Sequence, residues 1–301
     1  LNLLNKNSLL LNYYMSHIST FIELTRLKKP IGFMLLFWPC AWGLTIAYDF
    51  ESNMQIYIYY ILLFFSGAVL MRSAGCIVND IIDKDFDKKV ERTKNRPIAS
   101  GKITTKLAAI YAIILCLLAS IVLINFNFLT IILAIASMPF AFSYPLMKRF
   151  TYWPQFFLGI TFNYGLLLGW TSINEVITIV PILFYFGAIF WTLGYDTIYG
   201  FQDIEDDVII GVKSTSIKFK DNPKIFLLMC YLIFVICYLV VGKYLEYNYY
   251  FFIGTIIAVI HLFYYQVYHF DKSNKTGCLN IFKSNNLFGL IILINIFIGK
   301  I

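Results

Sequence analysis

The chain has 301 residues, of which 59% are hydrophobic, 19% are aromatic and only 14% are charged, with a net charge of +7. Its mean hydropathy of +0.72 is far above that of a soluble domain of this length. These values exclude an ordinary soluble enzyme and predict an integral membrane protein. Six cysteines without CxxC spacing and three histidines without ligand spacing predict neither disulfides nor a zinc or haem site.

Apolar runs long enough to cross a bilayer recur along the chain. A spanning helix needs about 20 mostly apolar residues. About nine such runs can be identified, at 31–49, 56–78, 106–124, 128–144, 154–172, 177–198, 225–242, 249–268 and 285–299. The sequence therefore predicts an all-α, multi-pass transmembrane helical bundle.

The basic residues are distributed unevenly over the connections between these runs. Of the 24 lysines and arginines, all except Arg72, Lys243 and Lys300 fall in the N-terminal segment or in the second, fourth, sixth and eighth connections. By the positive-inside rule, the N-terminus and these connections face the cytoplasm, or the matrix of a mitochondrion. The positive charge is thus explained by topology and does not indicate a nucleic-acid partner.

The first 25 residues are predicted to be an N-terminal extension ahead of one transmembrane domain at 26–301. The extension has neither the Arg/Ser pattern of a transit peptide nor the cleavage site of a secretory signal. Met15 is a candidate start of the physiological chain. Without a clear transit peptide, we expect a bacterial inner membrane, with a mitochondrial inner membrane as the alternative.

An acidic motif follows the second predicted span. Asn79, Asp83 and Asp87 are four residues apart, so they share one face of a helix leaving the membrane, with Asp80 beside them. Oxygen ligands at this spacing suit Mg²⁺, which takes one or two carboxylates together with water and phosphate oxygens. The motif therefore predicts a magnesium site at the cytoplasmic end of the span.

A second acidic motif follows the sixth predicted span on the same side of the membrane. Its residues Asp196, Tyr199, Asp203 and Asp207 are also spaced along one helix face. Clustered carboxylates without cations repel one another and resist ionisation. A single acidic run would be explained as a solvated helix end, but two matching clusters predict a metal ion bound together with a diphosphate.

Basic residues follow each acidic motif directly. Arg92, Lys94 and Arg96 come after the first motif, and Lys213 comes after the second. Guanidinium and ammonium groups at these positions are placed to contact phosphate oxygens. Taken one at a time, each of them also fits a charge that only sets the topology.

Several of these segments resemble the UbiA superfamily of intramembrane prenyltransferases, and most of all its branch that acts on 4-hydroxybenzoate. The matching segments are Met71–Asp80, Glu91–Gly101, Ser143–Arg149 and Tyr195–Tyr199, with further likeness at Arg26–Pro39 and Phe282–Gly289. The NDxxDxxxD and DxxxD signatures of the superfamily are both present. The likeness covers nearly the whole chain from about Arg26.

The resemblance implies nine helices around a central cavity that opens laterally to lipid. It also implies transfer of a polyprenyl group from a polyprenyl diphosphate to the 3-position of 4-hydroxybenzoate, as in ubiquinone biosynthesis. The implied cofactor is Mg²⁺, held on the diphosphate by Asn79, Asp80, Asp83, Asp87, Asp203 and Asp207.

The resemblance assigns roles to residues deeper in the membrane as well, where a charge is costly unless it is paired or functional. Asp196 would bind the acceptor hydroxyl or accept the released proton, or it would pair with Arg72. Arg72 would hold the benzoate carboxylate or neutralise a neighbouring aspartate. Tyr144 and Lys148 would point at the diphosphate or the acceptor, unless they are an interfacial tyrosine and a snorkelling lysine. Tyr199 completes this catalytic group.

The same residues are also compatible with other functions. A prenyltransferase of the same superfamily could use homogentisate or dihydroxynaphthoate as its acceptor. A cation-dependent transporter would also use charges in the membrane, but these should line a path through the bilayer. A phospholipid-type alcohol phosphotransferase would need a DxxDGxxAR motif, which the segment from Asp80 to Asp87 lacks.

Overall fold

The computed structural model describes residues 17–301, and all regular elements in that range are helices. Met15 and most of the expected N-terminal extension lie outside the described residues. Eight helical segments of the described range are long and apolar enough to cross a membrane. They are α3 (Met54–Ile82), α5 (Thr105–Leu123), α6 (Phe128–Phe150), α7 (Pro154–Asn163) with α8 (Gly165–Asn174), α9 (Ile179–Gly200), α12 (Pro223–Tyr244), α13 (Tyr249–Val259) with η1 (Ile260–Tyr268), and α14 (Lys275–Lys300).

The first predicted span forms helix α2 (Ile31–Ala47), whose 17 residues are at the lower end of the range that a full crossing needs. It is packed closely against α8, because small residues let the two backbones touch. A Cβ atom on Gly43 would lie 2.1 Å from the Leu166 carbonyl oxygen, and one on Gly169 would lie 2.2 Å from the Cys40 carbonyl oxygen. Glycine is therefore required on both sides of this contact.

The far end of α2 is closed by the last helix. The Lys300 ammonium at the end of α14 donates to the carbonyl oxygens of Thr45, Ile46 and Tyr48, at 3.1, 2.8 and 2.5 Å. The last carbonyls of a helix have no partner within the helix, and a cation there also interacts favourably with the helix dipole. Lys300 thus completes the hydrogen bonding at the end of α2.

Asparagine and threonine side chains define the starts of several long helices. Each accepts a hydrogen bond from a backbone N–H of the first turn, which satisfies a donor that the helix itself leaves unpaired. These capping residues are Asn53, Thr104, Asn127, Asn248 and Asn274. The membrane-spanning helices therefore begin at polar signals in the sequence.

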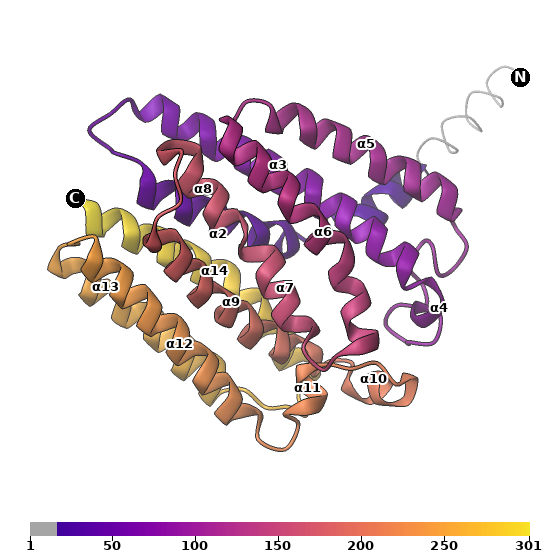
Figure 1. Cartoon of the computed structure of the whole chain (residues 1–301). Helices are drawn as coiled ribbons and strands as arrows, with labels where there is room; N and C mark the ends of the chain where they lie inside the picture. Colours follow the sequence, from indigo (N-terminus) through magenta and orange to yellow (C-terminus); the bar gives the residue numbers. More distant parts are fainter. Residues whose placement is uncertain (1–16) are drawn as a thin grey trace, which may run out of the picture.

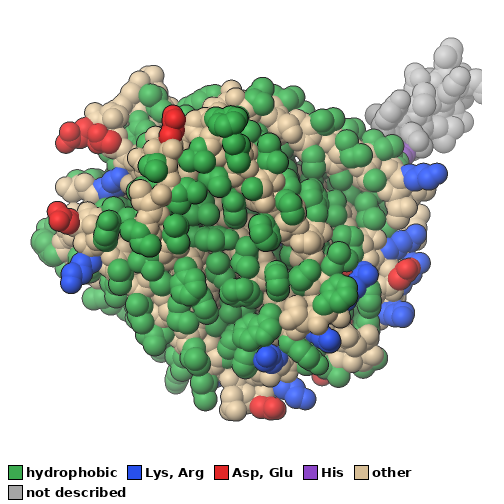
Figure 2. Space-filling model, in the orientation of Figure 1, with side chains coloured by type: hydrophobic (Ala, Val, Ile, Leu, Met, Phe, Trp, Pro, Cys, Tyr) green, Lys and Arg blue, Asp and Glu red, His purple; other side chains and the backbone are tan. Residues whose placement is uncertain are grey.

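The surface carries a broad apolar belt. Figure 2 shows hydrophobic side chains across the middle of the molecule, with charged side chains gathered toward its two ends. Large apolar side chains such as Ile113, Leu117 and Ile121 on α5 are exposed on it. An exposed apolar surface of this extent is expected where lipid replaces water.

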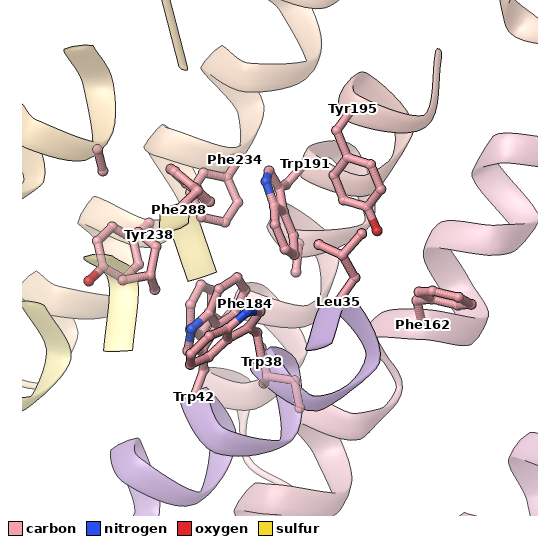
Figure 3. Packing of buried hydrophobic residues seen from close by; sticks show 14 of the residues in the cluster. Leu35, Trp38, Trp42, Phe162, Phe184, Trp191, Tyr195, Phe234, Tyr238 and Phe288 are labelled. Carbon is pink, nitrogen blue, oxygen red and sulfur yellow. The ribbon is translucent and has the colours of Figure 1, made fainter. Parts of the chain in front are cut away.

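Aromatic rings fill the interior between α2, α9, α12 and α14. Trp42 lies 5.0 Å from Trp191 and 5.5 Å from Phe184, measured between ring centroids, and Phe234 stacks on Tyr238 at 5.9 Å (Figure 3). Ring pairs in contact at these distances stabilise a core beyond the area that they bury. This cluster forms the rigid centre of the bundle.

The short helices α4 (Lys84–Asp87), α10 (Ile204–Ile210) and α11 (Thr215–Lys218) lie together at one end of the bundle (Figure 1). The turns that join α2 to α3, α8 to α9 and α12 to α13 lie at the opposite end. Both acidic motifs are therefore at the same end of the molecule, as their place in the sequence predicts.

Two predicted spans are not continuous α-helices. The span predicted at 154–172 is divided at Tyr164 into α7 and α8, next to the buried Asn163, whose amide nitrogen donates to Thr192 Oγ1 at 2.7 Å. The span predicted at 249–268 changes from α13 to the π-helix η1 at Ile260. Both irregularities coincide with buried polar side chains that bond to a neighbouring helix.

Candidate active site

The first acidic motif lies where α3 ends. We expected one continuous helix, but α3 stops at Ile82, Asp83 forms the junction, and α4 begins at Lys84. The helical i to i+4 hydrogen bonding nevertheless continues across this junction, because the amides of Asp83 and Asp87 donate to the carbonyls of Asn79 and Asp83 at 2.9 and 2.8 Å. The carboxylates are deeply buried, since Asp80, Asp83 and Asp87 are only 1%, 2% and 6% exposed.

Basic side chains from three separate segments hold these carboxylates. Arg26 binds Asp80 at 2.6 Å, and Arg96 binds Asp80 at 3.1 Å and Asp87 at 2.8 Å. Lys148, at the end of α6, binds Asp83 Oδ2 at 2.5 Å. Buried carboxylates are tolerated only with such partners. The first motif is thus a compact network of charges.

Arg26 was not predicted as a site residue. The sequence suggested only a charge that sets the topology, because Arg26 lies 54 residues before Asp80 and ahead of the first span. Its backbone is in the left-handed region, with φ of 57°. The place of Arg26 in the segment Arg26–Pro39, which resembles UbiA proteins, was the one available signal.

The second acidic motif is also split between two helices, contrary to the single helix face that we expected. Helix α9 ends at Gly200, and Asp203 precedes α10. The Tyr199 carbonyl, which a continuing helix would bond to the amide of Asp203, accepts instead from the backbone amide of Gln202 at 3.2 Å and from its side chain at 3.0 Å. The resulting turn leaves Asp203 beside the loop that follows the first motif.

Arg92 connects the two motifs. Its guanidinium binds both carboxylate oxygens of Asp203 and donates to the Tyr199 hydroxyl at 2.7 Å. Lys148 provides a second connection, because it binds Asp83 of the first motif and interacts electrostatically with Asp207 of the second. The backbone amide of Lys213 also donates to the Lys148 carbonyl at 2.8 Å. The structure thus brings the two predicted clusters together.

The electrostatics of the site favour binding of a cation. Burial raises the pKa of Asp87, although Arg96 opposes the shift. Burial and the neighbouring Asp203 raise the pKa of Asp207 to about 6. Both shifts mean that a negative charge is costly at these positions without further positive charge nearby.

A second polar group lies deeper in the bundle. Arg72 on α3 lies against Gly32 of α2 and over the Phe162 ring of α7, with its Cζ atom 5.2 Å from the ring centroid. It interacts electrostatically with Tyr144 on α6 and Asp196 on α9. The side chains predicted to handle the acceptor are therefore together, one level below the acidic motifs.

This deeper group contains a polar atom without a partner. The Arg72 Nε atom is buried and makes no hydrogen bond to protein. Asp196 keeps some accessible surface although it lies within α9. Buried unpaired polar groups are costly and rare, so they often mark a place where a ligand completes the bonding.

Three predicted site residues have different surroundings. Lys94 is exposed and pairs with Glu91 at 2.6 Å, and Lys213 donates to the Phe150 carbonyl at 3.2 Å. Asn79 is half-buried at the end of α3. Among the described contacts, neither lysine side chain is bonded to a carboxylate of an acidic motif.

The residues fit a hard cation, although their carboxylates do not converge on one point. Among residues 17–301, no three His, Cys, Asp or Glu side chains are arranged as a metal site. The reason is that arginine and lysine side chains lie between the carboxylates. However, Asp83 Oδ1 is buried without a hydrogen-bond partner. Carboxylate and amide oxygens with one free, buried oxygen are a donor set that suits Mg²⁺.

Fold and site together describe an intramembrane enzyme with an acidic centre. A model of the UbiA prenyltransferase family matches residues 36–291, and the chain belongs to this family.

Several relatives have names that specify a reaction. The chain is 40% identical to the mitochondrial 4-hydroxybenzoate polyprenyltransferase of Caenorhabditis elegans, over 92% of this chain and 77% of that one. It is 41% identical to the Homo sapiens protein of the same name, over 94% and 76% of the two chains. It is 38% identical to 4-hydroxybenzoate geranyltransferase 2 of Lithospermum erythrorhizon, over 96% and 93%.

Solved structures show the same fold at lower sequence identity. A UbiA homolog from Aeropyrum pernix K1 is 20% identical with a TM-score of 0.69, over 88% of this chain and 96% of that one. A UbiA homolog from Archaeoglobus fulgidus, bound to DMAPP and Mg²⁺, is 18% identical with a TM-score of 0.62, over 91% and 99%. The helical arrangement in Figure 1 is therefore that of UbiA proteins.

Proposed function

We propose that this protein transfers a polyprenyl group from a polyprenyl diphosphate to the 3-position of 4-hydroxybenzoate, a step of ubiquinone biosynthesis. The observation that carries the proposal is the joining of the two acidic motifs by Arg92 and Lys148, directly above the group of Arg72, Tyr144 and Asp196. This arrangement offers one site for a diphosphate and a deeper one for a small phenolic acid. The relatives that are named for this reaction support the same substrates.

The metal is part of this proposal. Mg²⁺ would be held by Asn79, Asp80, Asp83, Asp87, Asp203 and Asp207, and when bound it would neutralise the charge that develops on the departing diphosphate. The relative bound to DMAPP and Mg²⁺ supports this choice of ion.

The basic side chains would bind the diphosphate itself. A guanidinium has five N–H donors, so Arg92 and Arg96 can keep their carboxylate partners and still donate to phosphate oxygens. Lys148 lies between the motifs and adds a charge where the leaving group would sit. Lys94 and Lys213 are proposed to contribute from the edge of the site, because their present contacts are with other groups.

The deeper residues would bind the acceptor. The free Nε of Arg72 is suited to the benzoate carboxylate, with Tyr144 and Tyr199 completing the pocket toward the diphosphate. The bond between the allylic carbon and oxygen breaks, and its electron pair leaves with the diphosphate. The ring carbon ortho to the hydroxyl then forms the new carbon–carbon bond and loses its proton. Asp196 either accepts a hydrogen bond from the acceptor hydroxyl or accepts this proton.

We infer the orientation of the protein in the membrane from the distribution of its lysines and arginines. We place the acidic motifs and the N-terminal segment on the cytoplasmic or matrix side, because most lysines and arginines gather at that end. Helix α2 is then the ninth span, since the eight longer segments and α2 match the nine predicted runs. A central cavity that opens to lipid would receive the polyprenyl tail.

The cellular membrane is a separate question. From the sequence we expected a bacterial inner membrane, whereas the C. elegans and human relatives are named as mitochondrial. The relatives favour a mitochondrial membrane. Fractionation of the native cells, with an antibody against this chain, distinguishes the two locations.

The direct test uses purified membranes that contain the protein. They are incubated with a polyprenyl diphosphate, radiolabelled 4-hydroxybenzoate and Mg²⁺, and the lipids are then extracted. We expect label in the lipid phase with the native chain, and none with EDTA or with Asp83→Ala.

Absence of transfer by a folded native chain would contradict the proposed acceptor. The same assay with homogentisate and dihydroxynaphthoate then tests other members of the superfamily. A transporter is disfavoured because the carboxylates of both motifs lie at one end. At the opposite end, charges such as Asp49, Glu51 and Glu175 form no comparable cluster within residues 17–301.

A further inference from the structure

Three of the five tryptophans donate their indole N–H groups to a single short stretch of α14. The three bonds run from Trp191 to Asn285 Oδ1 (2.8 Å), from Trp38 to Asn286 Oδ1 (2.9 Å) and from Trp42 to the Gly289 carbonyl (2.9 Å). Inside a membrane no water can replace such bonds, so each indole requires a protein acceptor. The segment Phe282–Gly289, which we name the indole clamp, therefore sets how α2 and α9 are placed against α14.

Asn285 is the most constrained member of the indole clamp. It is fully buried, and its Oδ1 atom accepts from Trp191 and also from the Gln266 side chain at 2.9 Å. Gln266 in turn accepts from the Tyr231 hydroxyl at 2.6 Å, and the Asn285 amide donates to the Ile281 carbonyl at 3.1 Å. A buried polar network in which these groups are satisfied is rigid and specifies one arrangement.

The indole clamp continues directly to the second acidic motif. Phe282, one turn before Asn285, packs on the Tyr199 ring at 4.3 Å, and Tyr199 shares Arg92 with Asp203. On the other side, Trp191 meets the Tyr195 ring edge-on at 4.9 Å, as Figure 3 shows, and Tyr195 precedes Asp196. A shift of α14 along α9 would therefore move both ends of the second motif.

We infer that Asn285 is a positioning residue, which fixes the register of α14 against α9 and so holds Tyr199 and Asp203 in place for the diphosphate. Asn285 does not touch the acidic motifs, and it acts through Trp191 and Phe282. The inference rests on the proposed function, because it assumes that the acidic site binds a prenyl diphosphate. It does not depend on which aromatic acceptor is used.

The test compares Asn285→Leu with Asn286→Leu in full-length protein in detergent. Both changes replace an asparagine of the indole clamp by leucine and remove one indole bond, but only Asn285 bonds to the helix that carries the second acidic motif. The dissociation constant for geranyl diphosphate with Mg²⁺ is measured by calorimetry, and the thermal unfolding midpoint is measured in parallel.

We expect Asn285→Leu to weaken geranyl diphosphate binding about tenfold or more, which is the factor that corresponds to the loss of one hydrogen bond between the displaced second motif and the diphosphate. Asn286→Leu should also lower the unfolding midpoint, because Trp38 loses its acceptor, but it should bind within about twofold of the native chain. Equal affinities for the two variants would overturn the inference. If the native chain itself does not bind geranyl diphosphate, the proposed function is contradicted too. Failure of the inference alone can therefore be distinguished from failure of the proposed function.

Trp191→Phe tests the positioning role of Asn285 if the Asn285→Leu protein does not fold. It keeps an aromatic ring in the cluster, removes the donor to Asn285 and leaves the Asn285 side chain in place, at the cost of part of the volume of the indole. We expect the same loss of affinity, and we expect the double variant to be no weaker than the single ones, because both changes remove one interaction. Native affinity of a folded Trp191→Phe protein would contradict the positioning role.

Discussion

The two acidic motifs reach the same site in different ways. In the first, Asp80 and Asp83 are 1% and 2% exposed and are held by cations from three segments of the chain. In the second, Asp203 is 16% exposed and depends on a single partner, Arg92. The first motif is thus a fixed part of the fold, whereas the second is attached to it from outside. Changes in the first should affect stability and activity together, and changes in the second mainly activity.

The largest effect is expected for Asp83→Ala. It removes the buried carboxylate that bears the free oxygen and leaves Lys148 without its partner. We expect prenyl transfer to fall by at least about 100-fold, the size typical of losing a main electrostatic contact to the leaving group. Initial rates in purified membranes measure it.

Asp85→Ala is the matched control for that variant. Asp85 belongs to the same motif but is 88% exposed and pairs only with Lys88. Its removal should leave the rate within about twofold. Equal losses in the two variants would show that overall charge, and not the buried carboxylate, determines the activity.

The next effect concerns stability. Arg96→Met removes the cation shared by Asp80 and Asp87, and leaving a buried charge uncompensated costs about 3 kcal/mol or more. Arg92→Met removes a half-exposed partner and should cost less than about 1 kcal/mol. Denaturant unfolding in detergent compares the two. Equal losses of unfolding free energy in the two variants would contradict the view that only the first motif is a fixed part of the fold.

Arg92→Met should nevertheless reduce function. It cuts the connection from the first motif to Asp203 and Tyr199. We expect the half-saturating concentration of the polyprenyl diphosphate to rise about tenfold, as for the loss of a charge-assisted contact. An unchanged value would mean that the second motif is positioned without Arg92.

The smallest effect is expected for Lys94→Ala. The Lys94 side chain is exposed and pairs with Glu91 within its own turn. Such pairs contribute about 0–1 kcal/mol, so we expect less than a twofold change in rate and no measurable change in stability. A tenfold loss of activity would show that Lys94 turns toward the diphosphate when the substrate is bound.

Much of the fold could be predicted from the sequence, because membrane helices follow from length and hydropathy alone. All nine apolar runs are helical, but their ends differ where polar residues extend a helix beyond the apolar part. The run predicted at 285–299 belongs to a helix that begins at Lys275, and the run at 128–144 continues to Phe150. Hydropathy cannot detect such extensions, and it cannot detect the break at Tyr164 or the π-helix from Ile260 either.

The site was predicted less completely. The clustering of aspartates indicated the two motifs, and the structure joins them. Spacing alone suggested continuous helices, because it contains no information on the Gln202 side chain that ends α9. The role of Arg26 depends on a contact across 54 residues, which no local pattern predicts. Residues that act through tertiary contacts, such as Asn285, were visible only as part of a family-like segment.

The bond from Lys300 to the end of α2 has a consequence for assembly of the bundle. The carbonyl oxygens of Thr45 and Ile46 accept from a side chain that lies 255 and 254 residues further along the chain. A variant without a donor at this position, such as Lys300→Met, therefore leaves the end of α2 without that partner. The hydrogen bonding of α2 is thus complete only when α14 has docked beside it.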